Sequence, residues 1–71
     1  MNGQEWVSAF ARELGVAEPT AEEIEMLLDV ASVAAHSSER LAAPLTCYLI
    51  GKANMSASDA LALAQRLSAN E

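Results

Sequence analysis

The sequence is poor in cysteine, in basic residues and in long apolar runs. Its single cysteine, Cys47, cannot form an intrachain disulfide, which is typical of a cytoplasmic protein. Four basic residues stand against ten acidic ones, so the chain lacks the basic face that nucleic acids and anionic membranes require. The longest charge-free run, residues 41–51, is shorter than the ~20 residues of a membrane span. The N-terminus is polar and acidic, unlike a signal peptide. We therefore expect a soluble, cytoplasmic protein with no nucleic-acid or membrane partner.

Apolar residues make up 52% of the 71 positions, but fifteen of them are alanine. This length predicts a single domain over residues 1–71, and a chain so short buries only about 60% of its unfolded surface. Such a domain is marginally stable alone, so we expect a protein partner or a homodimer. The formal net charge of −6 lies within residues 1–30. This acidic half either keeps the domain soluble or attracts a basic protein.

Capping patterns mark the first two helices. Asn2 with Glu5, and Thr20 with Glu23, have the spacing of a capping box, in which each residue binds the other's backbone N–H. Gly15 predicts a left-handed end to the first helix. Apolar residues then recur at spacings of three and four. They are Trp6, Phe10 and Leu14 in the first helix, and Ile24, Leu27, Leu28, Ala31, Ala34 and Ala35 in a second helix of about 16 residues.

The start of the third helix is ambiguous. It lies near Ser38 or closer to Pro44, which favours a first turn, and Gly51 and Asn54 are both candidate ends. Nearly continuous apolar residues predict that this helix is the most buried one; they are Leu41, Leu45, Tyr48 and Leu49. Ser56 or Ser58 caps the last helix, which has Ala60, Leu63, Ala64 and Leu67 on its inner face, with Leu61 beside it. We therefore predict an all-α fold, a compact bundle of four short helices.

One cluster of polar residues suggests a ligand site. Arg40 precedes the third helix, whose first N–H groups have no obvious side-chain cap, and a helix N-terminus beside an arginine suits a phosphate or carboxylate. His36, Glu39 and Lys52 are the other candidate members of this ligand site. In the alternative interpretation, Glu39 caps the helix and pairs with Arg40, while His36 meets carbonyls at a helix C-terminus. One histidine and one cysteine cannot build a closed metal site, so we expect no metal and no cofactor.

Nothing in the sequence indicates a reaction. Cys47 lies within an apolar helix, where a thiol is usually inert. Ser37 and Ser38 neighbour His36, but adjacent residues do not form a catalytic triad. The three glycines are isolated, so there is no phosphate-binding loop. We expect no enzyme and no catalytic residue. Trp6 and Phe10 are candidate interface residues, because a partly exposed tryptophan is a typical anchor; core packing is the alternative.

Residues 35–46, with their His-x-x-Glu-Arg-x-x-Ala-Pro pattern, and residues 48–53 resemble a small bacterial helical domain family of unknown function. Members typically have a tryptophan in the first helix, as Trp6 is here. They occur alone or joined to molybdenum-cofactor guanylyltransferase domains, which attach GMP to molybdopterin. Leu41 departs from the family pattern, where many relatives have proline. The family has no established catalytic residues to carry over.

Three functions follow from these observations. The resemblance implies a non-catalytic accessory or interaction module for molybdenum-cofactor (molybdopterin guanine dinucleotide) biosynthesis, with the guanylyltransferase as protein partner. The polar cluster suggests instead a binder of a small anionic ligand at the turn between the second and third helices. The small core favours a self-associating bundle, in which two copies bury the region of Trp6 and Phe10.

Overall fold

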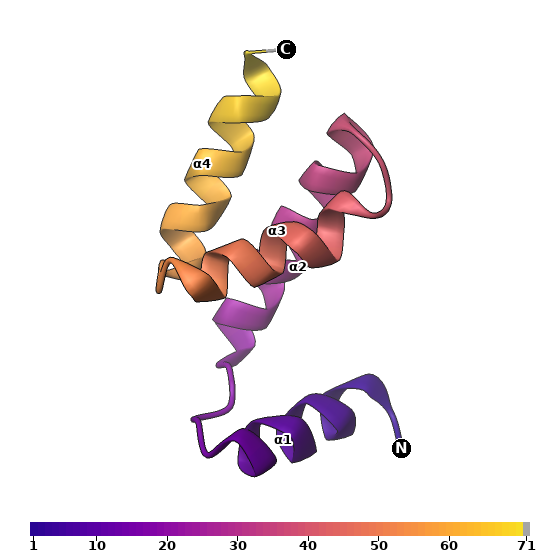
Figure 1. Cartoon of the computed structure of the whole chain (residues 1–71), viewed down its shortest axis with the longest axis vertical. Helices are drawn as coiled ribbons and strands as arrows, with labels where there is room; N and C mark the ends of the chain where they lie inside the picture. The colour runs from indigo at the N-terminus through magenta and orange to yellow at the C-terminus, as the bar shows by residue number, and fades with distance from the viewer. Residues whose placement is uncertain (71) are drawn as a thin grey trace.

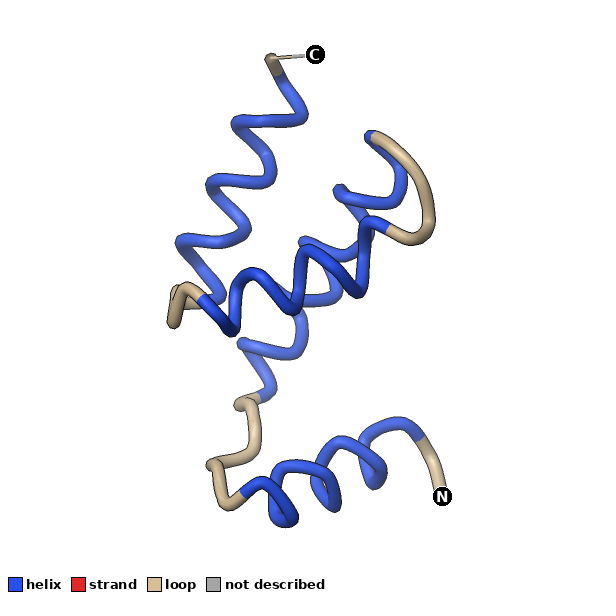
Figure 2. Tube along the Cα trace, viewed as in Figure 1, coloured by secondary structure: helices blue, strands red, loops and turns tan. Residues whose placement is uncertain are grey.

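The chain forms four α-helices, and the computed structural model describes residues 1–70 (Figure 1). The helices are α1 (Gly3–Leu14), α2 (Ala21–Ser37), α3 (Ala42–Lys52) and α4 (Ala57–Ala69). No strand occurs within residues 1–70, and short loops join the helices (Figure 2). The predicted all-α bundle of four short helices is therefore confirmed. Over the same residues, no helix has the length and apolar character needed to cross a bilayer.

Both capping boxes form as the sequence predicts. In α1, the N–H of Glu5 donates to Asn2 Oδ1 and the N–H of Asn2 donates to Glu5 Oε1, each at 2.8 Å. In α2, the N–H of Glu23 donates to Thr20 Oγ1 at 3.1 Å, and the N–H of Thr20 donates to Glu23 Oε1 at 2.8 Å. These bonds satisfy N–H groups that the first turn of a helix leaves without a partner. They fix where α1 and α2 begin.

The ends of α1 and α3 use a left-handed residue to stop the helix. Gly15 has φ 74°, and the N–H of Val16 donates to the carbonyl of Ala11 at 3.0 Å. After α3, Asn54 has φ 54° and the N–H of Met55 donates to the carbonyl of Ile50 at 3.1 Å. Asparagine tolerates this conformation better than most residues do. Of the two candidate ends of the third helix, Gly51 lies inside α3 and Asn54 terminates it.

The starts of α3 and α4 resolve the two remaining ambiguities. α3 begins at Ala42, so Pro44 lies in its first turn, where a missing N–H costs little. α4 is capped by Ser56, whose hydroxyl oxygen accepts the N–H of Asp59 at 3.1 Å. The hydroxyl of the other candidate, Ser58, lies 3.4 Å from that of Ser56.

α2 is the centre of the packing, because it contacts both α3 and α4. Val30 of α2 is completely buried, and Ala57 and Ala60 of α4 are also in the core. Alanine allows helix backbones to approach closely, but it contributes little apolar area. The core is therefore small, as the composition predicts.

The prediction that the third helix is the most buried one is wrong. No residue of α3 is buried, and Ile50 is only half-buried. The other large apolar side chains here are more than half exposed; they are Leu45, Tyr48 and Leu49, with Leu41 just before the helix. A continuous apolar run shows that a helix has an apolar surface. It does not show that the same chain covers that surface.

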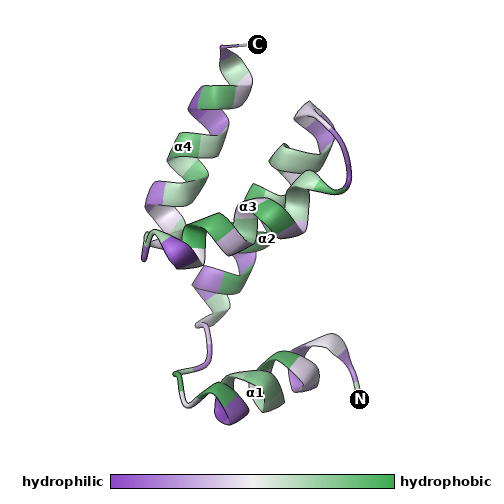
Figure 3. Cartoon of the chain, viewed as in Figure 1, coloured by the Kyte–Doolittle hydropathy of each residue, from purple (hydrophilic) through white to green (hydrophobic). Residues whose placement is uncertain are grey.

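α1 lies apart from the other three helices (Figure 1). It is found beyond the N-terminal end of α2, while the close helix packing joins α2 to α3 and to α4. Hydrophobic colouring nevertheless recurs along α1 (Figure 3). The molecule is accordingly elongated, with extents of 38 × 22 × 19 Å.

Candidate functional site

The first candidate surface is the apolar side of α1. Trp6, Phe10 and Leu14, at a spacing of four residues, form what we call the α1 stripe, and they are 60%, 52% and 63% exposed. The rings of Trp6 and Phe10 lie with their centroids 6.1 Å apart and their planes at 33°, within the range of favourable aromatic pairs. Val16 and Pro19, after the helix, extend this surface and help to line a hollow of about 300 Å³. Contiguous exposed apolar surface of this kind marks interaction sites.

The second candidate surface is an open apolar groove of about 420 Å³, which lies between α2, α3 and α4. Its lining includes Val33, Ala34 and Ser37 from α2, Thr46, Leu49 and Ile50 from α3, and Ala60, Leu63, Ala64 and Leu67 from α4. The groove exists because alanines line part of it, where larger side chains would fill the space between the helices. Its volume lies within the range of ligand and peptide sites.

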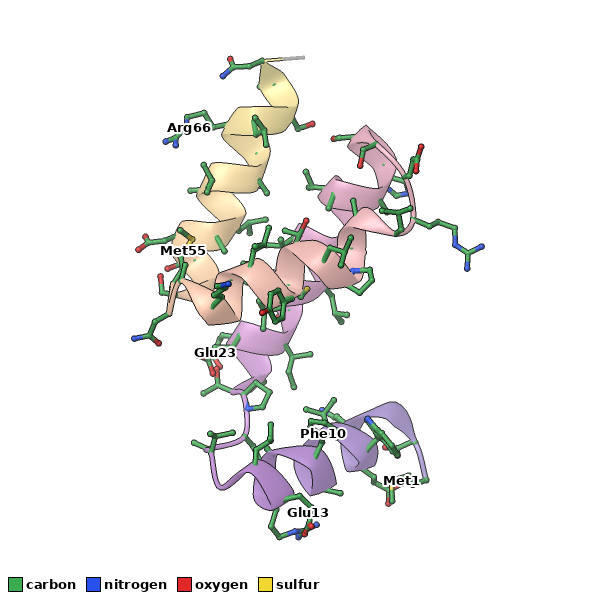
Figure 4. All side chains as sticks on the ribbon, in the orientation of Figure 1. Met1, Phe10, Glu13, Glu23, Met55 and Arg66 are labelled. Carbon is green, nitrogen blue, oxygen red and sulfur yellow. The ribbon has the colours of Figure 1, made fainter. Side chains whose placement is uncertain are left out.

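A hydrogen bond between α2 and α4 lies at one end of the groove. The hydroxyls of Ser37 on α2 and Ser68 on α4 lie 2.8 Å apart, in hydrogen-bond contact. Met55 also lines the groove, in the turn between α3 and α4. Figure 4 shows that Met55 is well separated from Phe10 of α1. The α1 stripe and the groove are thus two distinct apolar surfaces of one chain.

The predicted ligand residues are only partly brought together. His36, Glu39 and Arg40 are all exposed around the turn from α2 to α3, and Glu39 and Arg40 line an open depression there. His36 Nδ1 lies 3.2 Å from the hydroxyl of Ser32, one turn earlier in α2. Lys52 is at the opposite end of α3, ten residues or about 15 Å of helix from Ala42. Its ammonium lies 5.9 Å from the centre of the Tyr48 ring, in cation–π range. Lys52 therefore does not join the other three.

The first turn of α3 has no free N–H to offer an anion. As expected, no side chain caps this helix. However, the N–H groups of Ala42 and Ala43 donate to the carbonyls of Glu39 and Arg40, at 3.0 and 3.2 Å. Pro44, the third residue of α3, has no N–H. Binding of an anion at this helix start would rest on Arg40 and His36 alone.

Other chemistry finds little support among the described residues. Within residues 1–70, no three His, Cys, Asp or Glu residues are grouped so that they could hold a metal ion. Cys47 is half-buried within α3 and is not in a disulfide. The two apolar surfaces remain the most distinctive features of the described chain.

A family model for a domain of unknown function, DUF6457, matches residues 1–71. The chain belongs to the DUF6457 family. No curated protein and no solved structure shows a significant match to it. The description of the DUF6457 family specifies no activity, so what this DUF6457 domain does must be argued from its own surfaces.

Sequence reasoning found one of these surfaces and missed the other. Trp6 and Phe10 were predicted as interface residues, and their exposure is what an interface requires; the interface itself stays a prediction. The sequence does not predict the groove of this DUF6457 domain, because the spacing of Ala60, Leu63, Ala64 and Leu67 indicates an inner face of the last helix, and the structure places these residues along an open groove. The available signal was the abundance of alanine on that face. Alanine leaves space wherever the helices do not close completely.

Proposed function

We propose that this domain is a non-catalytic interaction module that binds a protein partner through the α1 stripe. The observation that supports the proposal is the exposure of Trp6, Phe10 and Leu14 on a helix held away from the packed part of the chain. An amphipathic helix with anchors at a spacing of four residues is a common mode of protein recognition. Large aromatic side chains provide much of the binding energy at such interfaces.

We further propose that the partner is a molybdenum-cofactor guanylyltransferase. Support comes from the resemblance of residues 35–46 and 48–53 to domains that occur joined to this enzyme. The charge distribution adds a physical argument, because residues 1–30 have seven acidic residues and one basic residue. This charge favours approach to a basic face of the partner and speeds association at low salt.

Binding of a small anion at the turn between α2 and α3 has less support. The N–H groups of Ala42 and Ala43 are already bonded to backbone carbonyls, and Lys52 lies at the far end of α3. An anion there would rely on exposed side chains in water, where a charge pair contributes at most about 1 kcal/mol.

The proposal is tested by titrating the purified guanylyltransferase of the same organism into the domain in a calorimeter. Phe10→Glu places a charge in the middle of the α1 stripe, and we expect it to weaken binding at least about tenfold, or 1.4 kcal/mol. Leu28→Glu is the matched control, because Leu28 is an exposed leucine on α2 outside the stripe and the groove. We expect it to bind like the wild type.

Two results would contradict the proposal. In the first, the wild-type domain does not bind the guanylyltransferase. In the second, Phe10→Glu binds as tightly as the wild type. The cellular form of the test is deletion of the domain, which we expect to lower molybdoenzyme activity; unchanged activity would count against the guanylyltransferase as partner.

A further inference from the structure

We infer that two copies of this chain form a homodimer by exchange, with α1 of each copy in the groove of the other. The inference takes from the proposed function only that the α1 stripe docks on protein. Here the partner is a second copy, and the guanylyltransferase would reach the stripe by displacing that copy. Each copy has one unpartnered amphipathic helix and one unfilled apolar groove. An exchange covers the α1 stripe and the groove in each of the two copies. No unpaired stripe or groove remains, which is the usual property of a symmetric dimer.

The exposed surface of the chain is larger than that of a typical monomer. The solvent-accessible area is 5519 Å² for a chain of 7.5 kDa. A folded monomer of this mass exposes about 4,200 Å², so the excess is roughly 1,300 Å² per copy. Two copies that bury this excess would form an interface of roughly 2,600 Å², within the range of obligate homodimers and above the ~1,600 Å² of a standard interface. A second copy therefore accounts for the area.

If α1 folded back along α2 of its own chain, it would fall short of the α2 side of the groove. The N–H of Val16 is bonded within the cap of α1, and Thr20 caps α2, so only residues 17–19 are free to make a reversal. Those three residues span at most about 10 Å. This is about the distance between the axes of two packed helices, so α1 could lie only directly beside α2. If α1 folded back along α2, Trp6 would lie about 12 Å above the level of Leu14. Along α2, the first residue that lines the groove is Val33, twelve residues and about 18 Å above Ala21, so the backbone of Trp6 would lie about 6 Å below the α2 lining.

Charge selects this pairing over two stripes packed on each other. The net charge of −6 lies in residues 1–30, while residues 31–71 have three acidic and three basic residues. Packing α1 on α1 would bring together two helices that each have Glu5 and Glu13 against Arg12, a net charge of −1 each, and like charges at an interface are unfavourable. In the exchange, α1, with net charge −1, meets the C-terminal half of α2 together with α3 and α4, whose charged residues Lys52, Asp59 and Arg66 give a net charge of +1.

The side chains also match in size and chemistry. The groove is lined mainly by alanine and leucine, with only serine and threonine hydroxyls as polar groups. The α1 stripe supplies two aromatic rings, each of which buries roughly 150–250 Å² when it is covered. Small side chains on the groove and large side chains on the helix are what ridges-into-grooves packing needs.

The test is light scattering of the full chain across a range of concentrations, with complementary variants. We expect the wild type to have twice its chain mass of 7.5 kDa. Phe10→Glu spoils the stripe and Leu67→Glu spoils the groove, and we expect each alone to raise the dimer dissociation constant at least about tenfold. Leu28→Glu is the control for Leu67→Glu, because both leucines are 65% exposed and only Leu67 lines the groove. We expect Leu28→Glu to stay dimeric.

Mixing the two disrupted variants tests the exchange itself. In the mixture, the Phe10→Glu chain has an intact groove and the Leu67→Glu chain has an intact α1, so one pairing is restored and a heterodimer should form. A mixture that stays monomeric overturns the inference. A wild type that is monomeric at every concentration also overturns it, whether Trp6 is exposed or covered within its own chain. The third overturning result is a Leu28→Glu control that dissociates as readily as Leu67→Glu.

A measurement on the wild type covers the case in which a variant does not fold. In a sample of labelled and unlabelled chains, we expect intermolecular nuclear Overhauser effects between the Trp6 indole and the methyl groups of Leu63 and Leu67. A dimer without these contacts overturns the inference. These tests need no guanylyltransferase, so a monomer that binds the enzyme refutes only the homodimer. A dimer that does not bind the enzyme refutes only the proposed function.

Discussion

Replacing Val30 by alanine tests whether the core lies where α2 meets α3 and α4. Val30 is the one side chain in residues 1–70 with no solvent exposure, and the change removes two methyl groups. At about 0.8 kcal/mol for each, the lost transfer free energy is about 1.6 kcal/mol, and the unfilled cavity adds to it. We expect a loss of roughly 2–3 kcal/mol, from a total of about 4–11 kcal/mol for a chain of this length.

The assay is thermal unfolding followed by circular dichroism, with all proteins at one concentration. A loss of this size lowers the midpoint by roughly 8–24 °C in so small a domain. Leu28→Ala is the control on the same helix, because Leu28 is 65% exposed, and we expect it to cost less than about 0.5 kcal/mol. If Val30→Ala were as mild as Leu28→Ala, the assignment of the core would be refuted.

Two further predictions concern the helix caps and the turn between α2 and α3. Thr20→Ala should cost about 1 kcal/mol of global stability, because it removes the cap of the central helix. Asn2→Ala should reduce the helicity of α1 but leave the unfolding midpoint of the monomer, followed by circular dichroism, within 2 °C of the wild type, because α1 packs little on the other helices. Equal losses of stability for Thr20→Ala and Asn2→Ala would contradict this. Inorganic phosphate should cause no saturable shift of the Ala42 and Ala43 amide resonances, because those N–H groups are already bonded. A saturable shift that Arg40→Ala abolishes would restore the anion site.

The sequence was most informative where the structure depends on near neighbours. The pairs Asn2 with Glu5 and Thr20 with Glu23 act over three residues, and Gly15 acts through its own backbone. Their effects can therefore be predicted without knowing the fold. The faces of the helices were less predictable, because the apolar spacing of α2 includes Leu28, which is 65% exposed, and omits Val30, which is completely buried.

The sequence could not show what covers each face. The apolar runs of α1 and α3 are equally consistent with burial in the same chain and with burial against another one. Trp6 illustrates this, since its type and spacing suit both a core and an interface. The alanines of α4 indicate that space is left beside this helix, but the volume of the groove could not be predicted, because it depends on the angles at which α2, α3 and α4 cross.

The candidate ligand cluster failed to converge for a geometric reason. Arg40 and Lys52 flank the same charge-free run, residues 41–51, and the length of α3 keeps them apart. The backbone carbonyls of Glu39 and Arg40 accept the N–H groups of the next helix. The residue types of this turn do not predict that its carbonyls accept these N–H groups.

The most direct test of the account is the fluorescence of Trp6, the only tryptophan in the chain. Its emission should have a water-like maximum at high dilution, and should shift to shorter wavelength as the protein is concentrated or as the guanylyltransferase is added. Emission at short wavelength at dilutions where light scattering gives the mass of a monomer would show that the chain covers its own α1 stripe. Emission that stays water-like under all these conditions would show that nothing docks there, and either result would contradict the account.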